Sequence, residues 1–409
     1  MNKKDSVAVV PKYRFPEFAL DASIDYVAGG FLFDPITNRN HHADLPILAI
    51  TQEYGAIPRD EIDYKVSVTE KSLKAYKIVE KGDFIISLRS FQGGIEYSMY
   101  DGICSPAYII LRKKTNIIDQ YYKYYFKSYR FIQDLNKDLE GIRDGKMISY
   151  SQFSSILLPK PDKEEQQKIA DCLSSIDDLI SAEEKKLSLL NDYKKGWMQK
   201  LFPSEGKTVP EWRFPEFRDS GDWENTTIEK IADYENGKAH ENNIIDNGKY
   251  IVVNSKFIST EGEIIKYTNE ANLLAYKGDI LMVLSDVPNG RALSKCYLVE
   301  KDNVYTVNQR VCRIIPEKVN STLLFYTINR NKYFLSFDDG VKQTNLKKND
   351  VLSCSIVIPK EPDEQEKIAD FLSGIDELIS SQKEKIEKLK QHKIALMQGI
   401  FPSLEDEDV

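Results

Sequence analysis

The sequence predicts an α+β protein in which a mixed domain followed by a long helix occurs twice. Short motifs recur at one constant separation, and each recurring block ends in a stretch with helical heptad spacing. The 409 residues are also too many for one hydrophobic core. The expected parts are a first mixed domain at 1–161, a first helix at 162–202, a second mixed domain at 203–361, a second helix at 362–401 and an acidic tail at 402–409.

The recurring motifs are separated by 199 residues. They are YRFPEF and WRFPEF at 13–18 and 212–217, KIADCLS and KIADFLS at 168–174 and 367–373, and FPS at 202–204 and 401–403. From Lys168 to Ser204, 19 of 37 positions are identical to those from Lys367 to Ser403. This period is far longer than a solenoid repeat, so it indicates a duplicated pair of domains.

Each mixed domain is expected to combine short strands with one helical stretch. Strands are predicted at 46–51, 84–88, 108–112, 250–254, 280–284 and 311–315, and helices at 117–135 and 321–334. The KGD tripeptides at 81–83 and 277–279 are typical of turns that lead into strands. Tyr121, Tyr122, Tyr124 and Tyr125 are expected to form a packed helix face rather than a base-stacking surface.

The two long helices carry apolar residues at coiled-coil spacing. The seam residues are Ile169, Leu173, Ile176, Ile180, Leu187, Leu190 and Trp197 in the first helix, and Ile368, Leu372, Ile375, Ile379, Ile386, Leu389 and Leu396 in the second. Both seams are interrupted at matching places, by Glu183 with Gln382 and by Lys194 with Lys393. Asp162 and Asp363 are candidate N-caps, and a proline follows each helix.

The junction between the halves indicates how the helices run. It reads FPSEGKTVPEWRFPEF, which combines the FPS near the C-terminus with the PKYRFPEF near the N-terminus. A pseudo-twofold molecule with nearby termini would show this likeness, and its twin helices would pair antiparallel. Two independent surface helices are the alternative.

The composition is that of a globular protein, with 41% hydrophobic and 29% charged residues. No run of 18 apolar residues is present, so no membrane association is expected. The start of the sequence has a basic flank followed by only a few apolar residues, an apolar stretch too short for a signal peptide. The five cysteines contain no CxxC pair, which favours free thiols and a cytoplasmic location.

The formal net charge of −8 argues weakly against a nucleic-acid partner. The charge is uneven, because residues 363–409 contain 6 basic and 12 acidic side chains whereas residues 1–162 contain 22 and 21. Both mixed domains are near neutral. A near-neutral domain can still carry a basic cleft.

Catalytic motifs are absent from the sequence. There is no Asn/Asp-Pro-Pro-aromatic motif for adenine methylation and no GxxxxGK[ST] phosphate loop. His41, His42, His240 and His392 lack the spacing of metal ligands. The Pro-Asp pairs at 161–162 and 362–363 are explained by helix capping better than by a nuclease motif. The chain is therefore expected to be non-catalytic and to bind no metal.

Several motifs together carry a family resemblance. EQQKIADCLSSIDDLI at 165–180 and EQEKIADFLSGIDELI at 364–379 each follow an LPKP- or IPK-type strand end. With RFPEF and KGD in each half, they resemble the specificity subunit of type I restriction-modification enzymes. The resemblance implies that each mixed domain is a target recognition domain for one half of a split, asymmetric DNA sequence. The helices would set the spacing. The first domain departs from the pattern, because it lacks a Trp-Glu start like that at 223–224.

The resemblance also implies partners and cofactors. The partners would be double-stranded DNA, two modification (methyltransferase) subunits and restriction (translocase/nuclease) subunits. S-adenosylmethionine, ATP and Mg would belong to those subunits, and none to this chain. Two alternatives remain, an orphan specificity subunit without a working nuclease and a protein-interaction scaffold that binds no DNA, which the acidic total would suit.

Base reading needs Arg, Lys, Asn, Gln or Ser on loops that reach base edges. The candidates are Arg39, Arg89, Ser90, Gln92, Arg143, Lys146, Lys238, Asn289, Arg291, Lys342, Gln343 and Asn345. His41, His42 and His240 lie beside some of them. Glycines next to several candidates allow close approach of the backbone. Solvated loops without DNA contact are the alternative for each residue taken alone.

Overall fold

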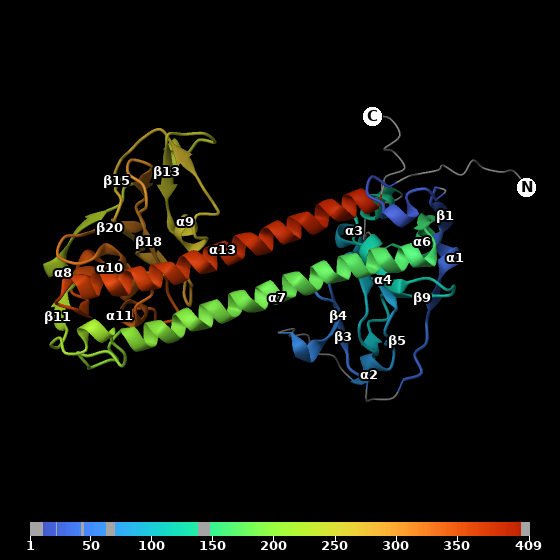
Figure 1. Cartoon of the computed structure of the whole chain (residues 1–409), viewed down its shortest axis with the longest axis horizontal. Coiled ribbons are helices and arrows are strands. Elements are labelled where there is room, and N and C mark those ends of the chain that lie inside the picture. Colours follow the sequence, from blue (N-terminus) through green and yellow to red (C-terminus); the bar gives the residue numbers. More distant parts are fainter. Residues whose placement is uncertain (1–10, 22, 42–44, 63–69, 138–147, 402–409) are drawn as a thin grey trace, which may run out of the picture. The chain divides into compact units, whose positions relative to one another are not determined.

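The computed structural model describes residues 11–21, 23–41, 45–62, 70–137 and 148–401. The chain divides into two compact units, one of residues 1–185 with 384–409 and one of residues 186–383. The boundary falls inside both long helices, α7 (Lys163–Leu201) and α13 (Pro362–Ile400), each of 39 residues. Each unit therefore holds one mixed domain and a part of each long helix (Figure 1).

The first unit is built on an antiparallel sheet of order β2-β9-β6-β7. Its strands are β2 (Phe33–Ile36), β9 (Ile109–Lys113), β6 (Phe84–Ile86) and β7 (Glu96–Tyr97). Phe33 packs edge to face against Phe84 and Tyr122, with ring centroids 5.4 and 5.3 Å apart. The predicted tyrosine face is confirmed, because Tyr121, Tyr122, Tyr124 and Tyr125 are all buried.

Shorter elements complete the first domain. The strand pairs are β1 (Asp25–Ala28) with β10 (Leu157–Lys160), β3 (Leu48–Thr51) with β4 (Gly55–Pro58), and β5 (Lys77–Val79) with β8 (Gly102–Cys104). The helices are α1 (Gly29–Leu32), α2 (Glu70–Leu73), α3 (Ser90–Gly93), α4 (Asp119–Tyr125), α5 (Tyr129–Asn136) and α6 (Tyr150–Ser155). The β1–β10 ladder leads directly into α7.

The second unit repeats this plan. Its antiparallel sheet has the order β12-β20-β16-β18, from β12 (Ala232–Asn236), β20 (Val311–Pro316), β16 (Ile280–Val283) and β18 (Cys296–Leu298). The ladder equivalent to β1–β10 is β11 (Glu224–Thr227) with β22 (Ser355–Ile358). Four short helices of this unit are α8 (Ile228–Ile231), α10 (Ser321–Ile328), α11 (Lys332–Leu335) and α12 (Lys348–Leu352).

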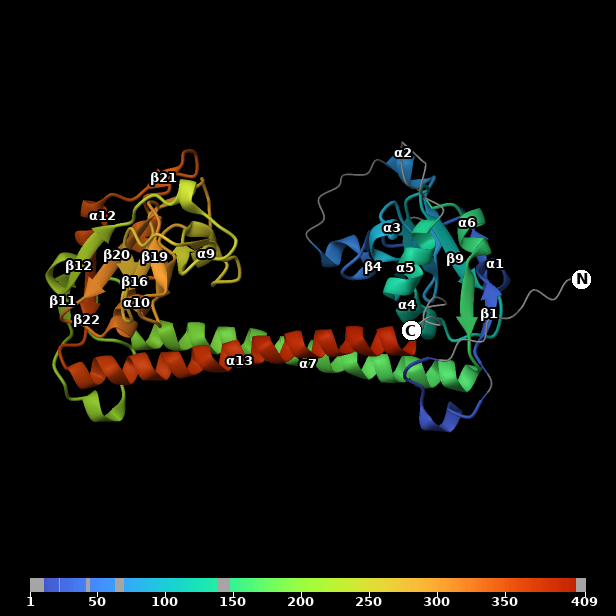
Figure 2. The ribbon, with the colours of Figure 1, turned by 90° about the horizontal axis from the view of Figure 1, so that it is seen from above.

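The second unit also carries a mixed sheet of order β14-β13-β19-β15. Figure 2 labels its strand β19, near α9. It consists of β14 (Tyr267–Thr268), β13 (Tyr250–Val253), β19 (Tyr305–Val307) and β15 (Leu274–Ala275), and α9 (Ser255–Ser259) follows β13. Strands β13 and β19 are parallel to each other. The mixed composition of both domains confirms the predicted α+β class.

The six predicted strands all occur, but the two predicted domain helices are each broken. In the first domain, the side chain of Ser128 caps α5 by accepting a hydrogen bond from Phe131 N, so 117–135 is not one helix. In the second, Arg330 adopts a φ of 56° between α10 and α11. Asp363 was expected as an N-cap. This was wrong, because α13 already begins at Pro362 and Asp363 lies in its first turn.

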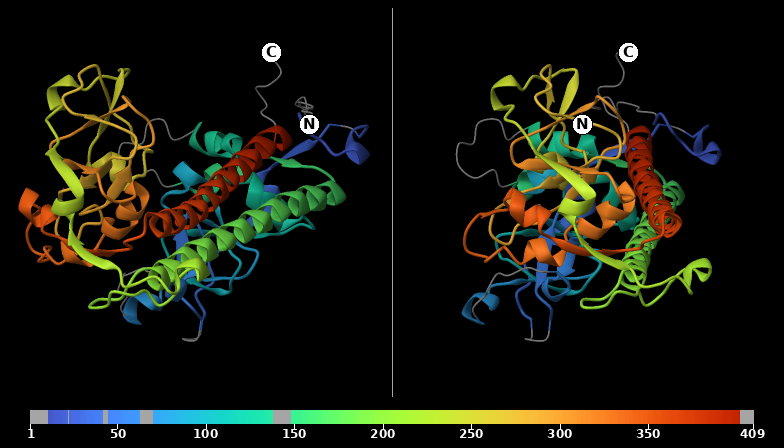
Figure 3. Two further views of the ribbon diagram at one scale, coloured as in Figure 1. Left: turned by 60° about the vertical axis from the view of Figure 1, so that its left-hand side comes forward. Right: turned by 90° about the vertical axis from the view of Figure 1, so that its left-hand side faces the viewer.

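The long helices run antiparallel inside each unit. In the first unit, Lys385 pairs with Glu183 and Lys393 with Asp177, both at 2.5 Å, so the partner in α7 moves back as the residue in α13 moves forward. In the second, Trp197 contacts Phe371 with ring centroids 5.2 Å apart, whereas Lys194 pairs with Asp376 at 2.6 Å, which gives the same direction. Figure 3 shows α7 in green beside α13 in red.

The seam residues differ in burial. Fully buried members are Ile169, Leu173, Ile180, Ile368, Leu372, Ile375, Ile379 and Ile386, and half-buried members are Ile176, Leu187, Leu190, Trp197, Leu389 and Leu396. Several of the buried members also pack against the mixed domains. Ile169 and Leu173 join an apolar core of the first domain, and Ile368 and Leu372 pack with Leu323 and Tyr326 of the second.

The motif before each domain meets the end of a long helix. Tyr13 N donates to Gly399 O at 2.9 Å, and Trp212 N donates to Lys200 O at 3.0 Å. The N-terminal motif therefore lies against the end of α13, while both chain ends lie outside the described residues. In the part of the chain that the structure describes, no helix combines the length and the apolar character needed to cross a bilayer. All five cysteines are free thiols.

Candidate nucleic-acid interface

The recurring RFPEF motif seats each domain on a long helix. Arg14 Nε and Nη2 donate to Glu165 Oε1 and Oε2 at 2.8 and 2.9 Å, and Arg213 makes the same fork with Glu364 at 2.6 and 2.6 Å. Both carboxylates are at most 2% exposed. The hydrogen bonds that the two guanidinium groups donate to these carboxylates raise the pKa of both arginines. The forks hold the helix start and the motif segment together in both units.

The glutamine after each of these glutamates bridges to the domain. Gln166 Oε1 accepts from Ile118 N at 2.9 Å, next to α4. Gln365 Oε1 accepts from Asn320 N at 2.8 Å, next to α10. The EQ pair of the recurring helix motif is therefore part of the scaffold.

The KGD turns are scaffold as well. Both oxygens of Asp83 accept from Arg112 at 2.8 Å, and Asp279 Oδ2 accepts from Arg313 Nε at 2.6 Å. The Asp83 hydrogen bonds raise the pKa of Arg112. Strands β6 and β16 begin directly after these aspartates, which confirms the predicted turns.

A lysine–aspartate–tyrosine joint connects three elements of the first unit. Tyr124 on α4 donates to Asp177 Oδ2 on α7 at 2.9 Å, and Lys393 on α13 donates to Asp177 Oδ1 at 2.5 Å. The ammonium of Lys393 also lies 5.1 Å from the centre of the Tyr124 ring. Burial raises the pKa of Tyr124, so its hydroxyl keeps the proton that it donates.

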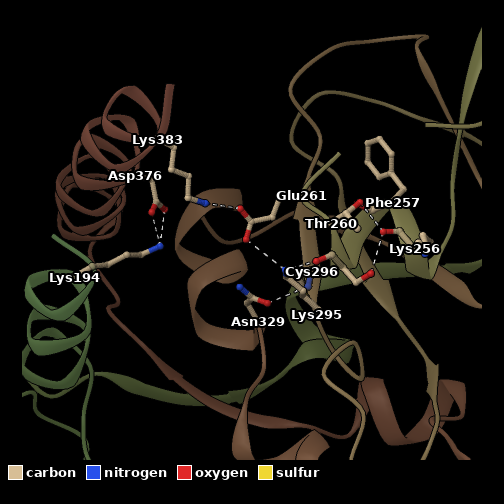
Figure 4. Close-up of polar contacts among 11 residues, drawn as sticks. Lys194, Lys256, Phe257, Thr260, Glu261, Lys295, Cys296, Asn329, Asp376 and Lys383 are labelled. Carbon is tan, nitrogen blue, oxygen red and sulfur yellow. Dashed lines mark hydrogen bonds and ion pairs between the residues drawn. The ribbon is translucent and has the colours of Figure 1, made fainter. Parts of the chain in front are cut away.

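The second unit has the same joint. Lys194 on α7 donates to both oxygens of Asp376 on α13 at 2.6 and 2.7 Å (Figure 4). Tyr326 on α10 donates to Asp376 Oδ2 at 2.7 Å, and Lys194 lies 5.0 Å from its ring centre. Burial raises the pKa of Tyr326. The sequence pointed to both lysines as seam interruptions but not to their aspartate and tyrosine partners.

One further joint is specific to the second unit. Glu261, after α9, accepts from Lys383 on α13 at 3.0 Å and pairs with Lys295 at 3.4 Å (Figure 4). The hydrogen bond from Lys383 lowers the pKa of Glu261. The equivalent of Lys383 in α7 is Glu184, which pairs with Lys390 instead.

The second unit brings two predicted DNA-reading loops together. Strands β17 (Ser285–Asp286) and β21 (Thr344–Asn345) pair antiparallel and join the loop after β16 to the loop before α12. Asn289 Nδ2 donates to Gly340 O at 3.3 Å, and Gln343 Nε2 donates to Ser285 Oγ at 2.7 Å. The exposed candidates on this shared edge are Asn289, Arg291, Lys342, Gln343 and Asn345.

Aspartates fix the conformation of these loops. Asp286 Oδ2 accepts from Ala292 N at 2.6 Å and Leu293 N at 3.0 Å, and Asp338 Oδ2 accepts from Asn289 N at 2.9 Å. Sequence reasoning missed these carboxylates. An aspartate at the start of a loop is a sequence signal for a local turn. The sequence does not reveal, however, that an aspartate of one loop accepts a hydrogen bond from the other loop.

In the first unit, the predicted DNA-reading residues that follow β6 lie at α3. Arg89 and Gln92 are exposed, and Gln52 Nε2 donates to Arg89 O at 3.1 Å. Ser90 is 1% exposed, and its hydroxyl accepts from Ser87 N at 2.9 Å, so its oxygen serves the loop's own fold. Arg143 and Lys146 lie outside the described residues.

The remaining candidates lie on other loops. Arg39 and Lys238 are exposed. His240 is buried, with its Nε2 3.0 Å from Thr306 Oγ1, and His41 Nε2 lies 3.1 Å from Leu73 O. His42 is outside the described residues. Within the described ranges, no three His, Cys, Asp or Glu side chains are grouped to hold a metal ion.

Two α+β domains share the same scaffold joints, and each carries exposed Arg, Lys, Asn or Gln side chains on its loops. The class of protein that this duplicated arrangement matches is a DNA specificity subunit. The family model of the type I restriction modification DNA specificity domain matches residues 33–192 and again 220–391. The chain belongs to this family.

Curated relatives are of the same kind. The type I restriction enzyme MjaVIII specificity subunit of Methanocaldococcus jannaschii is 29% identical over 367 residues, which cover 83% of each chain. The putative type I restriction enzyme MjaX specificity subunit of the same organism is 25% identical over 359 residues, 82% of each chain.

Solved structures share the fold. The S subunit of a type I restriction-modification system from M. genitalium superposes with a TM-score of 0.58 at 14% identity, over 97% of this chain and 100% of that chain. A chain from a study of complex assembly and conformational transition of the type I R-M system gives 0.53 at 14% identity, over 92% and 97%. DNA recognition within a type I restriction-modification system is therefore the role of this chain.

Proposed function

We propose that the chain reads a bipartite, asymmetric DNA sequence, with one domain for each half-site. The observation that carries this proposal is the duplication of one scaffold under two different loop edges. The forks, turns and joints recur in both units, whereas the loop after β6 exposes Arg89 and Gln92 and the loop after β16 exposes Asn289 and Arg291 at other places in a different loop sequence. The same supports under two different loop sequences suit two unlike half-sites.

The chemistry of the second edge supports major-groove reading. A glutamine or asparagine amide pairs with adenine, and an arginine or lysine pairs with guanine. Gln343, Asn345 and Arg291 supply both kinds of group on one surface, and Lys342 adds a cation that suits a phosphate. In the first unit Arg89 and Gln92 supply the same two kinds.

The partners follow from the family. The family supports DNA together with methyltransferase and restriction subunits as partners in general. We propose that two modification subunits and then restriction subunits dock on this chain in the cytoplasm. S-adenosylmethionine, ATP and Mg would be bound by those subunits, and this chain would supply sequence recognition alone.

The test is single-molecule sequencing of adenine methylation in DNA from cells that express this chain with its modification subunit. A split, asymmetric methylated sequence that disappears when this chain is deleted is the expected result. A competent modification subunit that methylates the same sequence without this chain would refute the proposal.

The loop residues can be tested by the salt dependence of DNA binding. Lys342→Ala in the assembled complex should weaken binding to all sequences alike and lower the slope of log K against log salt by about 1. Gln343→Ala should instead relax the preference at one base pair, with an unchanged slope. Equal behaviour of the two variants would contradict these roles.

A further inference from the structure

Two unusually exposed valines stand on the joined loops of the second unit. Val341 is 75% exposed and Val287 is 62% exposed, which places both among the four most exposed large apolar side chains of the described residues. Val287 follows β17 and Val341 precedes β21, so both lie beside the β17–β21 ladder. Because the transfer of apolar surface out of water lowers the free energy, a ligand that covers these side chains with an apolar group would bind more tightly.

Side-chain carboxylates accept hydrogen bonds from the backbone N–H of both valines. Val287 N donates to Asp286 Oδ1 at 2.9 Å, and Val341 N donates to Asp339 Oδ1 at 2.9 Å. The backbone hydrogen bonds from Lys342 and Val341 lower the pKa of Asp339, which keeps it ionised as an acceptor. Asn289 ties the two loops to each other through Gly340.

The neighbours of the valines are polar and cationic. Arg291, Lys342, Gln343 and Asn345 are exposed on the same two loops. A protein partner would need a broad apolar patch, and two isolated valines among cations and amides do not form one. A base-pair edge in the major groove combines hydrogen-bonding groups with one apolar group, the thymine C5 methyl.

The first unit has a comparable feature. Leu88 is 52% exposed and lies directly before Arg89, in the loop that follows β6. An exposed apolar side chain therefore accompanies the candidate arginine after the KGD strand in both halves.

We propose that Val287 and Val341 read thymine methyl groups in the half-site bound by the second domain. This proposal rests on the proposed function and adds the class of base that this edge prefers. The half-site should therefore contain at least one T·A pair opposite the valine loops, next to the pairs read by Gln343 or Asn345.

The test uses deoxyuridine, which lacks the methyl group and keeps every hydrogen-bonding atom of thymine. The complex of this chain with its modification subunits is bound to duplexes in which each thymine of that half-site is replaced in turn. One or two replacements should weaken binding about three- to fivefold. That loss should vanish in Val287→Ala or Val341→Ala, each at its own position. Val209→Ala, an exposed valine away from the loops, is the matched control and should keep the full loss.

The outcomes separate the two proposals. Sequence-specific binding that is indifferent to every deoxyuridine would overturn methyl reading and leave the proposed function intact. A half-site of G·C pairs alone would do the same. A complex that shows no preference for the methylated sequence over random DNA would overturn both.

Discussion

At the scale of single residues, the paired side chains of the recurring motifs are the most sensitive points. Glu364 is almost fully enclosed, and Arg213 is its bidentate partner. Arg213→Met would leave an uncompensated buried carboxylate and should lower the free energy of unfolding by about 3–5 kcal/mol. Denaturant unfolding of the full chain measures this. Arg218→Met, an exposed arginine nearby, should change it by less than about 0.5 kcal/mol.

Through Glu96, the stability of the first unit should fall as the pH rises. Its carboxyl group is 1% exposed in β7, and Lys127 Nζ lies 2.6 Å from Oε2. Burial raises the pKa of Glu96 despite Lys127. The folded state therefore holds this proton more tightly than the unfolded state does, so stability is fully present below the ordinary value of 4.5 and is lost as the pH rises through the folded pKa.

Glu96→Gln should remove this dependence. The melting temperature of the variant relative to the natural chain should rise between pH 4.5 and pH 7, as followed by calorimetry. Glu80→Gln, in which the replaced carboxylate is exposed, is the control. A difference between Glu96→Gln and the natural chain that stays constant with pH would contradict the assignment.

The sequence could not have identified Glu96 as buried, because β7 has only two residues and carries no period-2 pattern. The same holds for Ser90, which looked like a loop residue for base contact and is enclosed by its own turn. By contrast, the tyrosines of α4 were assigned correctly, because a run of aromatic residues at helical spacing can hardly remain exposed. Local spacing predicts packing well, whereas it says little about which polar residue of a loop faces outward.

At the scale of helices and strands, the lysine–aspartate–tyrosine joints explain why the seams contain lysine. A lysine at a seam position weakens apolar packing, and here each finds a carboxylate and an aromatic face. A double-mutant cycle of Lys194→Met and Asp376→Asn should give a coupling of about 1–2 kcal/mol. The exposed pair of Lys388 with Glu384 should give less than about 0.5 kcal/mol in the same unfolding measurement.

The joint also links the helix pair to the domain, which hydrogen exchange can test. Each aspartate contacts a lysine of the opposite helix and a tyrosine of the domain, so loss of Lys194 should loosen α10 as well as the helix pair. Hydrogen exchange of α10 should become faster in Lys194→Met. Unchanged exchange there would show that the tyrosine contact is independent of the lysine.

The long helices were the elements most fully predicted from the sequence. Their ends were placed within two residues, because heptad spacing over 39 residues is a strong signal. The domain helices were merged, because a single capping serine or a residue with positive φ interrupts a helix without changing its apolar spacing. The β17–β21 ladder was not predicted, because two-residue strands depend on tertiary contacts alone.

At the scale of the whole molecule, separate reading edges predict separable specificity. Replacement of residues 204–358 by the corresponding domain of a relative with another target should change one half of the methylated sequence and leave the other half unaltered. Methylation sequencing gives the answer directly. A change in both halves, or in neither, would contradict one domain per half-site.

The net charge of −8 also has a place at this scale. Most of the excess acid lies in residues 363–409, outside the sequence segments that contain Arg89 and Lys342. Total charge was therefore a poor guide to the partner, since local groups at the edges decide DNA contact. The family match and the duplicated scaffold are stronger evidence for a DNA partner than the negative net charge is against one.

The matching joints at Asp177 and Asp376 finally bear on how such a protein can change over generations. A domain is attached through an arginine fork, a glutamine bridge and a tyrosine that are the same in both units, and none of these attachments involves the loops that we propose to read DNA. A foreign domain that brings these few residues would fit either place without new compensating mutations. Recombination could then supply new target sequences in single steps, whereas point mutation would have to rebuild a reading edge one residue at a time.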